Sequence, residues 1–468
     1  MGASDYGLYN LIAGVVGMLT FLNNCLTVSS QRYMSVSMGS GDNDRINLVY
    51  NTSFFLHLLL GIGVVLLLEL GSFFIDHLNI DPDRFWCARV IYQFLILTTF
   101  LRIISVPYDA LINAHEDMIA FAAIELLDSL LLLVVAISIQ YIPYDKLIYY
   151  GLTVLLIALL NVILKWIWCR FQYSQFRIKL LANKKRFLTK EMSGFAGWNM
   201  FGGLAMMGRN QGVAVIINLF LGTIANAAYG IANQINGALS SFSGTFQRAI
   251  NPQLMKSEGM NDRERLLRIS NITAKYSVLA LGFLSIPLII VMPEVLQIWL
   301  KDDIPANTME LSRCILIMTL LYQYSTGIMS AIQAAGDIKR YQITMGVILL
   351  LNIPLSYLIL KVGLPVYYVT IGFILLEFVS LIARIRIAND LIQMSKKDFI
   401  NTVVKPTTLI LTAALVFGLV ARFFCSTMWG AVIFTSVASS IAFIIMVWMF
   451  DFSEDQRSMI MNKIITRK

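Results

Sequence analysis

The stretch at residues 223–247 reads TIANAAYGIANQINGALSSFSGTFQ. It is long enough to cross a membrane as a helix, yet it carries five carboxamide side chains among small and apolar residues. A carboxamide in hydrocarbon is costly unless it has a partner or water. The stretch therefore predicts a hydrated, polar path through the bilayer.

The rest of the chain has the composition of an integral membrane protein. Of its 468 residues, 57% are hydrophobic and only 14% are charged, and the mean hydropathy is +0.72. Apolar blocks of this kind span membranes as helices, and the alternating segments of a membrane barrel are absent from the sequence. We expect an all-α polytopic membrane protein with thirteen spans, at 8–31, 51–75, 86–110, 117–141, 146–168, 195–221, 223–247, 270–299, 311–335, 341–360, 364–383, 406–421 and 430–450.

The basic residues orient these spans. When the gaps between blocks are numbered alternately, one set of gaps holds 25 of the 36 basic residues and the other set holds five. Loops rich in Lys and Arg remain in the cytoplasm, so the C-terminus is predicted to be cytoplasmic. The excess of basic residues in these loops accounts for the net charge of +8, so no nucleic-acid partner is expected. Thirteen spans then place Met1 outside, and we expect that one helix upstream is missing from the sequence.

The sequence lacks the residues that several classes of function require. The predicted external loops are too short for a soluble catalytic domain. The five cysteines have no metal-ligand spacing and the three histidines are isolated, so we expect no metal and no cofactor. A glycine-rich phosphate loop is also absent from the sequence, and direct ATP hydrolysis is not supported. The chain is therefore expected to be a transporter and not an enzyme.

The amide-rich stretch has a counterpart near the N-terminus. Segments 6–51 and 229–271 both open with Tyr-Gly, place Gln-Arg at the end of a helix, and continue into Asn-Asp-Arg-x-x-Leu. A seven-residue spacing puts small and amide side chains on one stripe of each helix. Such stripes either pack helices together or line a hydrated cavity, and their matching positions favour a cavity. The stripes are Asn10, Gly17, Asn24 and Gln31 in the first segment, and Asn226, Asn233, Ser240 and Gln247 in the second.

With the missing helix restored, each half of the chain would have six spans. An even number of spans makes the halves parallel repeats. We therefore predict an N-terminal lobe at 1–168, a basic cytoplasmic linker at 169–194 and a C-terminal lobe at 195–390. Two additional transmembrane helices and a cytoplasmic tail would follow at 391–468.

Arg209 is the most deeply placed base in the membrane blocks. It lies beside a wedge of amides on the same helix, formed by Asn199, Asn210, Gln211 and Asn218. A guanidinium suits bidentate phosphate binding, so we hypothesise that Arg209 contacts a diphosphate while the amides contact sugar hydroxyls. The alternative is a buried arginine paired with an acid on another helix.

The other charges in the blocks have two interpretations each. Arg102 can pair with Asp109, Glu125 or Asp128, and this cluster is either a structural ion pair or a site for a coupling ion. Glu125 and Asp128 are three residues apart and share a helix face. Four bases near block ends can extend to the interface, and Glu69 and Glu377 are also expected there. These bases are Arg89, Lys165, Lys275 and Arg313, of which Lys275 is also a candidate for ion pairing or coupling.

Several motifs resemble those of one transporter family. They read GASDYGLYN at 2–10, VPYDALINAHEDM at 106–118, NQG at 210–212, NAAYGIANQ at 226–234 and NPQ at 251–253. In this order the motifs resemble the polysaccharide flippase branch of the multidrug/oligosaccharidyl-lipid/polysaccharide exporter superfamily, over roughly residues 1–390. The chain departs from the family where Asp128 is followed, four positions later, by Leu132 and not by a base.

The resemblance implies a MATE-like fold of two pseudo-symmetric six-helix lobes. It further implies that the protein flips an undecaprenyl-diphosphate-linked oligosaccharide across the bacterial inner membrane by alternating access, coupled to an ion. Its partners would be that lipid-linked oligosaccharide, the bilayer lipid and other polysaccharide assembly proteins. Two alternatives remain, namely a multidrug or cation antiporter of the same superfamily, and a membrane-embedded polysaccharide polymerase or ligase. The polymerase or ligase is disfavoured because such enzymes place catalytic groups on a large external loop.

Overall fold

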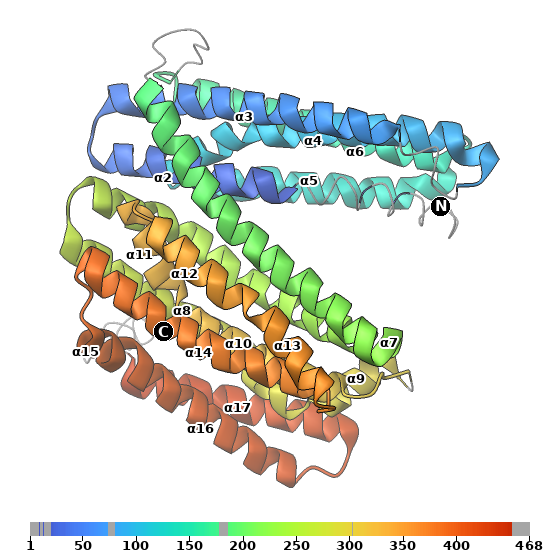
Figure 1. Cartoon of the computed structure of the whole chain (residues 1–468), viewed down its shortest axis with the longest axis vertical. Coiled ribbons are helices and arrows are strands. Elements are labelled where there is room, and N and C mark those ends of the chain that lie inside the picture. The colour runs from blue at the N-terminus through green and yellow to red at the C-terminus, as the bar shows by residue number, and fades with distance from the viewer. Residues whose placement is uncertain are drawn as a thin grey trace, which may run out of the picture. The chain divides into compact units, whose positions relative to one another are not determined.

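The computed structural model describes residues 9, 13, 20–73, 80–176, 186–301 and 303–451. Within these ranges every regular element is helical, which confirms the all-α class (Figure 1). Ten helices are long and apolar enough to cross a membrane, or up to eleven if a bent pair counts as one span. The count of thirteen spans stays a prediction, because α7 (Arg186–Gly259) is counted once in this total.

The helix α7 is interrupted at Gly222. Its 74 residues would extend roughly 110 Å as a straight helix, whereas the hydrocarbon core is about 30 Å thick. Gly222 has φ 78° and ψ −171°, a conformation that glycine adopts without steric cost. We infer that α7 contains two spans joined at Gly222, the residue that separates the predicted blocks 195–221 and 223–247.

The chain divides into two compact units. Unit 1 holds residues 1–203 and 255–261, and unit 2 holds residues 204–254 and 262–468. The chain therefore leaves unit 1 within α7 and returns to it for the last turns of the same helix. The predicted division into lobes, linker and additional helices stays a prediction.

Unit 1 is built on α4, half of whose apolar window is buried. Ile91, Tyr92 and Ile96 of α4 pack against Val64 of α3 and Leu147 of α6. The Tyr92 hydroxyl also donates to the Leu68 carbonyl at 2.6 Å. Figure 1 shows α3, α4 and α6 running side by side. The helices of unit 1 are α2 (Thr20–Gly39), α3 (Asn43–Ser72), α4 (Phe85–Ala114), α5 (Met118–Ser138) and α6 (Lys146–Gln172).

Unit 2 is packed around α8. The helices α10 and α11 form a bent pair, with an angle of 43° at the break between them. Leu281 and Ile290 of α8 share a core cluster with Ile410 of α16 and Phe443 of α17. The helices of unit 2 are α8 (Arg263–Ile290), α9 (Met292–Leu300), α10 (Thr308–Gln323), α11 (Thr326–Ala335), α12 (Lys339–Leu350), α13 (Asn352–Lys361), α14 (Tyr367–Ile392), α15 (Lys396–Phe399), α16 (Lys405–Phe423) and α17 (Met428–Phe450).

Two ion pairs hold the last two helices onto the rest of unit 2. Near the end of α16, Arg422 Nη2 lies 2.5 Å from Glu294 Oε1 of α9. Directly after α17, Asp451 is buried and pairs with Lys275 of α8. Lys275 thus has an ion-pair partner in Asp451, and its role in coupling stays a prediction. The pairs lie at opposite ends of the α16–α17 hairpin, so they fix it at both ends of its length.

The turns that follow α2 and α7 have the same local structure. Asp42 caps α3 and Asp262 caps α8, and each carboxylate accepts from the backbone N–H three residues later at 2.9 Å. The residues before these caps, Gly41 and Asn261, both have positive φ, at 71° and 56°. The structural register therefore matches Asp42 with Asp262. Matching the Asn-Asp-Arg strings at 43 and 261 is wrong by two residues, because the cap and the left-handed residue define the turn.

Candidate functional site

Part of the first predicted stripe lies outside the described residues. This holds for Asn10 and Gly17, and for the side chain of Asn24. Gln31 is described and is half-buried in α2. The proposed matching of the two stripes therefore stays a prediction.

The second stripe, on the second span of α7, divides into two parts. Asn226 is half-buried, and Asn233 is exposed and donates from Nδ2 to the Tyr229 carbonyl of its own helix at 2.9 Å. Farther along, Gln247 Nε2 donates to Gln323 Oε1 of α10 at 3.2 Å. Ser240 is half-buried, and its hydroxyl lies 3.4 Å from Asn236 Oδ1. The part around Asn226 and Asn233 thus keeps amides accessible, while Gln247 connects two helices.

The helix α7 also carries a second polar stripe, which was not predicted from the sequence. Thr319 Oγ1 donates to Asn236 Oδ1 at 2.7 Å, Ser243 Oγ donates to Gln323 Oε1 at 2.7 Å, and Ser330 Oγ donates to Asn251 Oδ1 at 2.8 Å. These bonds join α7 to α10 and α11, which is how polar side chains associate helices in a membrane. The spacing of Asn236, Ser243, Gln247 and Asn251 places them on one helix face and was a usable signal.

Arg209 lies on the first span of α7, within unit 2. The side chain is half-exposed, and its Nε and Nη2 donate to Asn210 Oδ1 at 3.1 and 2.9 Å. The guanidinium carbon lies 5.6 Å from the centre of the Phe373 ring. Among the residues that the structure describes, no carboxylate pairs with Arg209. A guanidinium has five N–H donors, so donors remain for a further acceptor.

The amides predicted around Arg209 have different environments. Asn210 and Gln211 are exposed, and Asn218 is half-buried. Asn199 belongs to unit 1, where it is buried and donates to the Phe195 carbonyl at 3.1 Å. Within unit 2, the structure therefore places Asn210, Gln211 and Asn218 on the same span as Arg209.

In unit 1, Lys165 and not Arg102 supplies the cation to the predicted acidic cluster. Lys165 Nζ of α6 lies 2.7 Å from Asp109 Oδ1 of α4 and 3.0 Å from Glu125 Oε1 of α5. The lysine is 4% exposed, so the expectation that it extends to the interface is wrong. Arg102 is exposed. The error arose because hydropathy gives the depth of a residue but not the face of the helix that carries it.

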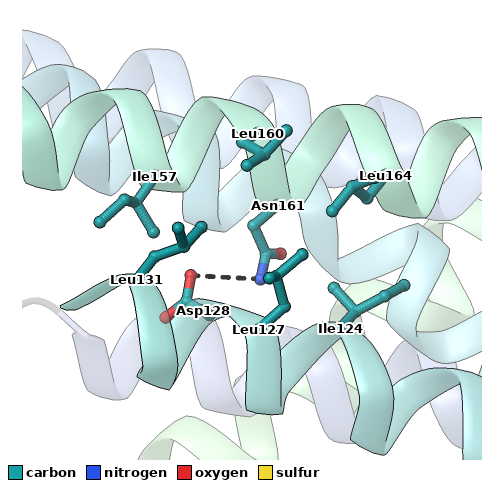
Figure 2. Close-up of a pocket in the computed structure, with 8 residues that line it drawn as sticks. All are labelled: Ile124, Leu127, Asp128, Leu131, Ile157, Leu160, Asn161 and Leu164. Carbon is teal, nitrogen blue, oxygen red and sulfur yellow. Dashed lines mark hydrogen bonds between the residues drawn. The ribbon is translucent and has the colours of Figure 1, made fainter. Parts of the chain in front are cut away.

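The third acid of the predicted cluster, Asp128, lies one turn from Glu125, in a groove between α5 and α6. Figure 2 shows Asp128 directed toward Asn161, and the distance between Asp128 Oδ1 and Asn161 Nδ2 is 3.4 Å. Leucine and isoleucine side chains of both helices line the groove around this pair. Glu125 and Asp128 therefore both connect α5 to α6, one through a lysine and the other through an amide.

Unit 2 contains a buried ion pair that the sequence analysis did not identify. Glu377 and Arg384 of α14 are 5% and 3% exposed and pair with each other, so the interfacial placement of Glu377 is wrong. Arg384 Nη1 also donates to Ser325 Oγ at 3.0 Å. Because Ser325 lies at the break between α10 and α11, this bond connects the ion pair to the bend. The seven-residue spacing of the two charges was a signal that they share a helix face.

The sequence of the chain also matches a known protein family. A family model described as "Polysaccharide biosynthesis protein" matches residues 1–258, more than half of the chain. The chain belongs to this family. This confirms the resemblance drawn from the sequence motifs. No curated protein matches the chain.

Comparison with solved structures identifies the fold of this chain. A crystal structure of a MATE mutant has a TM-score of 0.75 at 14% identity and covers 84% of this chain and 90% of its own. An outward-facing multidrug resistance MATE transporter of the MOP superfamily has a TM-score of 0.73 at 15% identity, with 84% and 89% covered. A MOP superfamily transporter from Pyrococcus furiosus, described as having reversed polarity in its binding pocket, has a TM-score of 0.71 at 15% identity, with 83% and 88% covered.

The fold is therefore MATE-like, similar to the folds of these MATE and MOP-superfamily transporters. Together with the apolar helices, this similarity supports a multi-pass membrane protein.

Proposed function

We propose that the protein is a flippase for an undecaprenyl-diphosphate-linked oligosaccharide, such as a repeat unit of O-antigen, capsule or exopolysaccharide. It would act by alternating access in the bacterial inner membrane, with a cytoplasmic C-terminus. The polysaccharide biosynthesis family supports the class of substrate, and the transporter fold supports the mode of action. The exposed amides of α7 supply hydrogen-bond donors and acceptors suited to sugar hydroxyls.

The observation that carries this proposal is the environment of Arg209. The guanidinium is half-exposed on a membrane helix, bonded to an amide, and without a carboxylate partner among the described residues. A charge in such a position is costly and indicates a functional role. A diphosphate would supply the missing anion, and guanidinium–phosphate contacts are strong and directional.

The Lys165 cluster is our candidate for ion coupling. Two carboxylates face one ammonium there, so the fully ionised cluster keeps one net negative charge. One proton or one monovalent cation would neutralise it. Such intramembrane groups commonly mark ion pathways, and this cluster lies on different helices from the Arg209 site.

The test of substrate binding is Arg209→Gln, with export of surface polysaccharide measured in a deletion strain at matched protein levels. We expect export to fall at least about tenfold, because a hydrogen bond to a charged group contributes about 1.5–3 kcal/mol. Arg209→Lys keeps the charge but loses the bidentate geometry, so it should fall between the wild type and the glutamine variant.

The matched control is Arg340→Gln. Arg340 forms an exposed pair with Asp390 at 2.9 Å, and exposed pairs contribute little. Normal export by the control together with full export by Arg209→Gln would contradict the assigned role of Arg209.

A multidrug antiporter is the second candidate function. The observation in its favour is the fold similarity to a multidrug resistance transporter. A cationic drug, however, would be repelled by Arg209. Drug susceptibility of the deletion strain separates the two functions, because loss of an antiporter sensitises cells to drugs while leaving polysaccharide export intact.

A further inference from the structure

Two glycines allow the ends of α2 and α7 to cross in backbone contact. A Cβ added at Gly39 would lie 2.1 Å from the Lys256 carbonyl oxygen. A Cβ added at Gly259 would lie 2.0 Å from the Val36 carbonyl oxygen and 3.1 Å from Gly39 Cα. No side chain can occupy either position without moving a backbone segment. Small residues allow this kind of close approach between membrane helices.

The crossing is reciprocal. Each glycine meets the carbonyl of the residue that lies three positions before the other glycine, because Gly39 contacts Lys256 and Gly259 contacts Val36. This relation has the register of the capped turns, in which Asp42 matches Asp262. Contacts of this self-matching kind are typical of two-fold interfaces, and here both surfaces come from one chain.

An ion pair adds to the contact. Lys256 Nζ lies 2.5 Å from Glu116 Oε1, in the turn between α4 and α5. Next to it, His115 stacks on Tyr173 with 3.9 Å between the ring centres. Burial lowers the pKa of His115, and the nearby Lys256 ammonium lowers it further. The end of α7 is thus held by backbone packing against α2 and by charge against the α4–α5 turn.

The segment that makes these contacts is short, and the residues directly before and after it in the sequence belong to unit 2. Residues 255–261 belong to unit 1, whereas Leu254 and Asp262 belong to unit 2. Pro252 lies within the helix just before the segment, and Asn261 at its end has a left-handed φ of 56°. Pro removes a helical hydrogen bond and a left-handed residue ends a helix, so both borders are places where the backbone direction can change.

We propose that residues 255–261 form a latch that docks on unit 1 in one transport state and leaves it in another. The docked state is held by the crossing of Gly39 with Gly259 and by the pair of Lys256 with Glu116. The latch lies on the side predicted to be cytoplasmic, since Lys256 and Arg265 belong to the basic set of loops. The proposal rests on the proposed transport activity, but not on the identity of the substrate.

The test is a covalent closure of the latch. The five cysteines are free, so they are first replaced by serine, and Glu116→Cys and Lys256→Cys are then combined in that background. A short bifunctional methanethiosulfonate reagent joins the two thiols, and mass spectrometry measures the joined fraction. We expect export to fall in proportion to that fraction and to recover when a reductant releases the link. Full export by the joined protein would overturn the proposal, as would a pair that never joins.

Glycine variants test the crossing itself. Gly39→Ala and Gly259→Ala should each lower the joined fraction about tenfold, since overpacking costs about 1–3 kcal/mol. The matched control is Gly63→Ala, because a Cβ there meets nothing within 4 Å. Undiminished joining in Gly259→Ala would contradict the crossing, and size-exclusion chromatography of each variant separates undocking from misfolding.

The two proposals fail in different ways. If the substrate is wrong, the deletion strain exports polysaccharide normally, while joining of the cysteine pair still depends on Gly39 and Gly259. If the latch is wrong, the strain needs the protein for export, but the joined protein exports at the normal rate.

Discussion

Arg384→Met is expected to be the most destabilising single substitution considered for this protein. It leaves the Glu377 carboxylate buried at 5% exposure, without the guanidinium that pairs with it. Removing one partner of a buried ion pair costs about 3–5 kcal/mol. The variant also loses the bond to Ser325, so the bend between α10 and α11 loses a support. We expect the melting temperature in detergent to fall on the order of 10 °C.

A double variant identifies the cause. Replacing the pair together, as Glu377→Leu with Arg384→Met, removes both charges and should restore most of the lost stability, because apolar replacements of buried pairs are often neutral. Arg340→Met is the exposed control, since the Arg340 and Asp390 side chains are 62% and 50% exposed and the pair contributes about 0–1 kcal/mol. A double variant that melts as low as Arg384→Met would show that the lost contacts, and not the unpaired charge, cause the effect.

The same pair shows why helix ends were harder to predict than helix positions. Hydropathy ended the block at residue 383, but α14 continues to Ile392, and these last turns bury Arg384, Ile387 and Ala388 while Asn389 and Asp390 are exposed. Arg384 therefore fell in a predicted loop, and Glu377 fell near the end of a predicted span. A hydropathy window finds a lipid-facing helix well, but it does not extend into turns whose polar side chains are satisfied by neighbouring helices.

Local signals were more informative where one residue determines the backbone. Gly222 separated two predicted spans, and the structure breaks α7 there because only the glycine readily adopts φ 78°. The capped turns before α3 and α8 also follow from local chemistry. Aligning the two Asn-Asp-Arg strings, however, places the repeats two residues out of the register that the caps Asp42 and Asp262 define. The partner of an intramembrane acid was less predictable, because Arg102 is closer in sequence to Asp109 and Glu125, whereas the more distant Lys165 is the base that pairs with them.

Lys165→Met is expected to abolish export. The substitution leaves Asp109 and Glu125 as two carboxylates that share a site without their cation. Like charges that share one site repel, and the missing ammonium also removes a connection between α4, α5 and α6. We expect export to fall about a hundredfold or more and the melting temperature to decrease. Arg102→Met is the control, because Arg102 is exposed and lies outside the Lys165 contacts.

Neutralising the acids as well separates structure from coupling. In the triple variant Asp109→Asn, Glu125→Gln and Lys165→Met, no charge remains uncompensated, so the melting temperature should return to within a few degrees of the wild type. A purely structural ion cluster would then also regain export. A coupling site would not, because no group is left to take up a proton or a cation. We expect a stable protein that does not export, and normal export by the triple variant would show that the cluster only holds the three helices together.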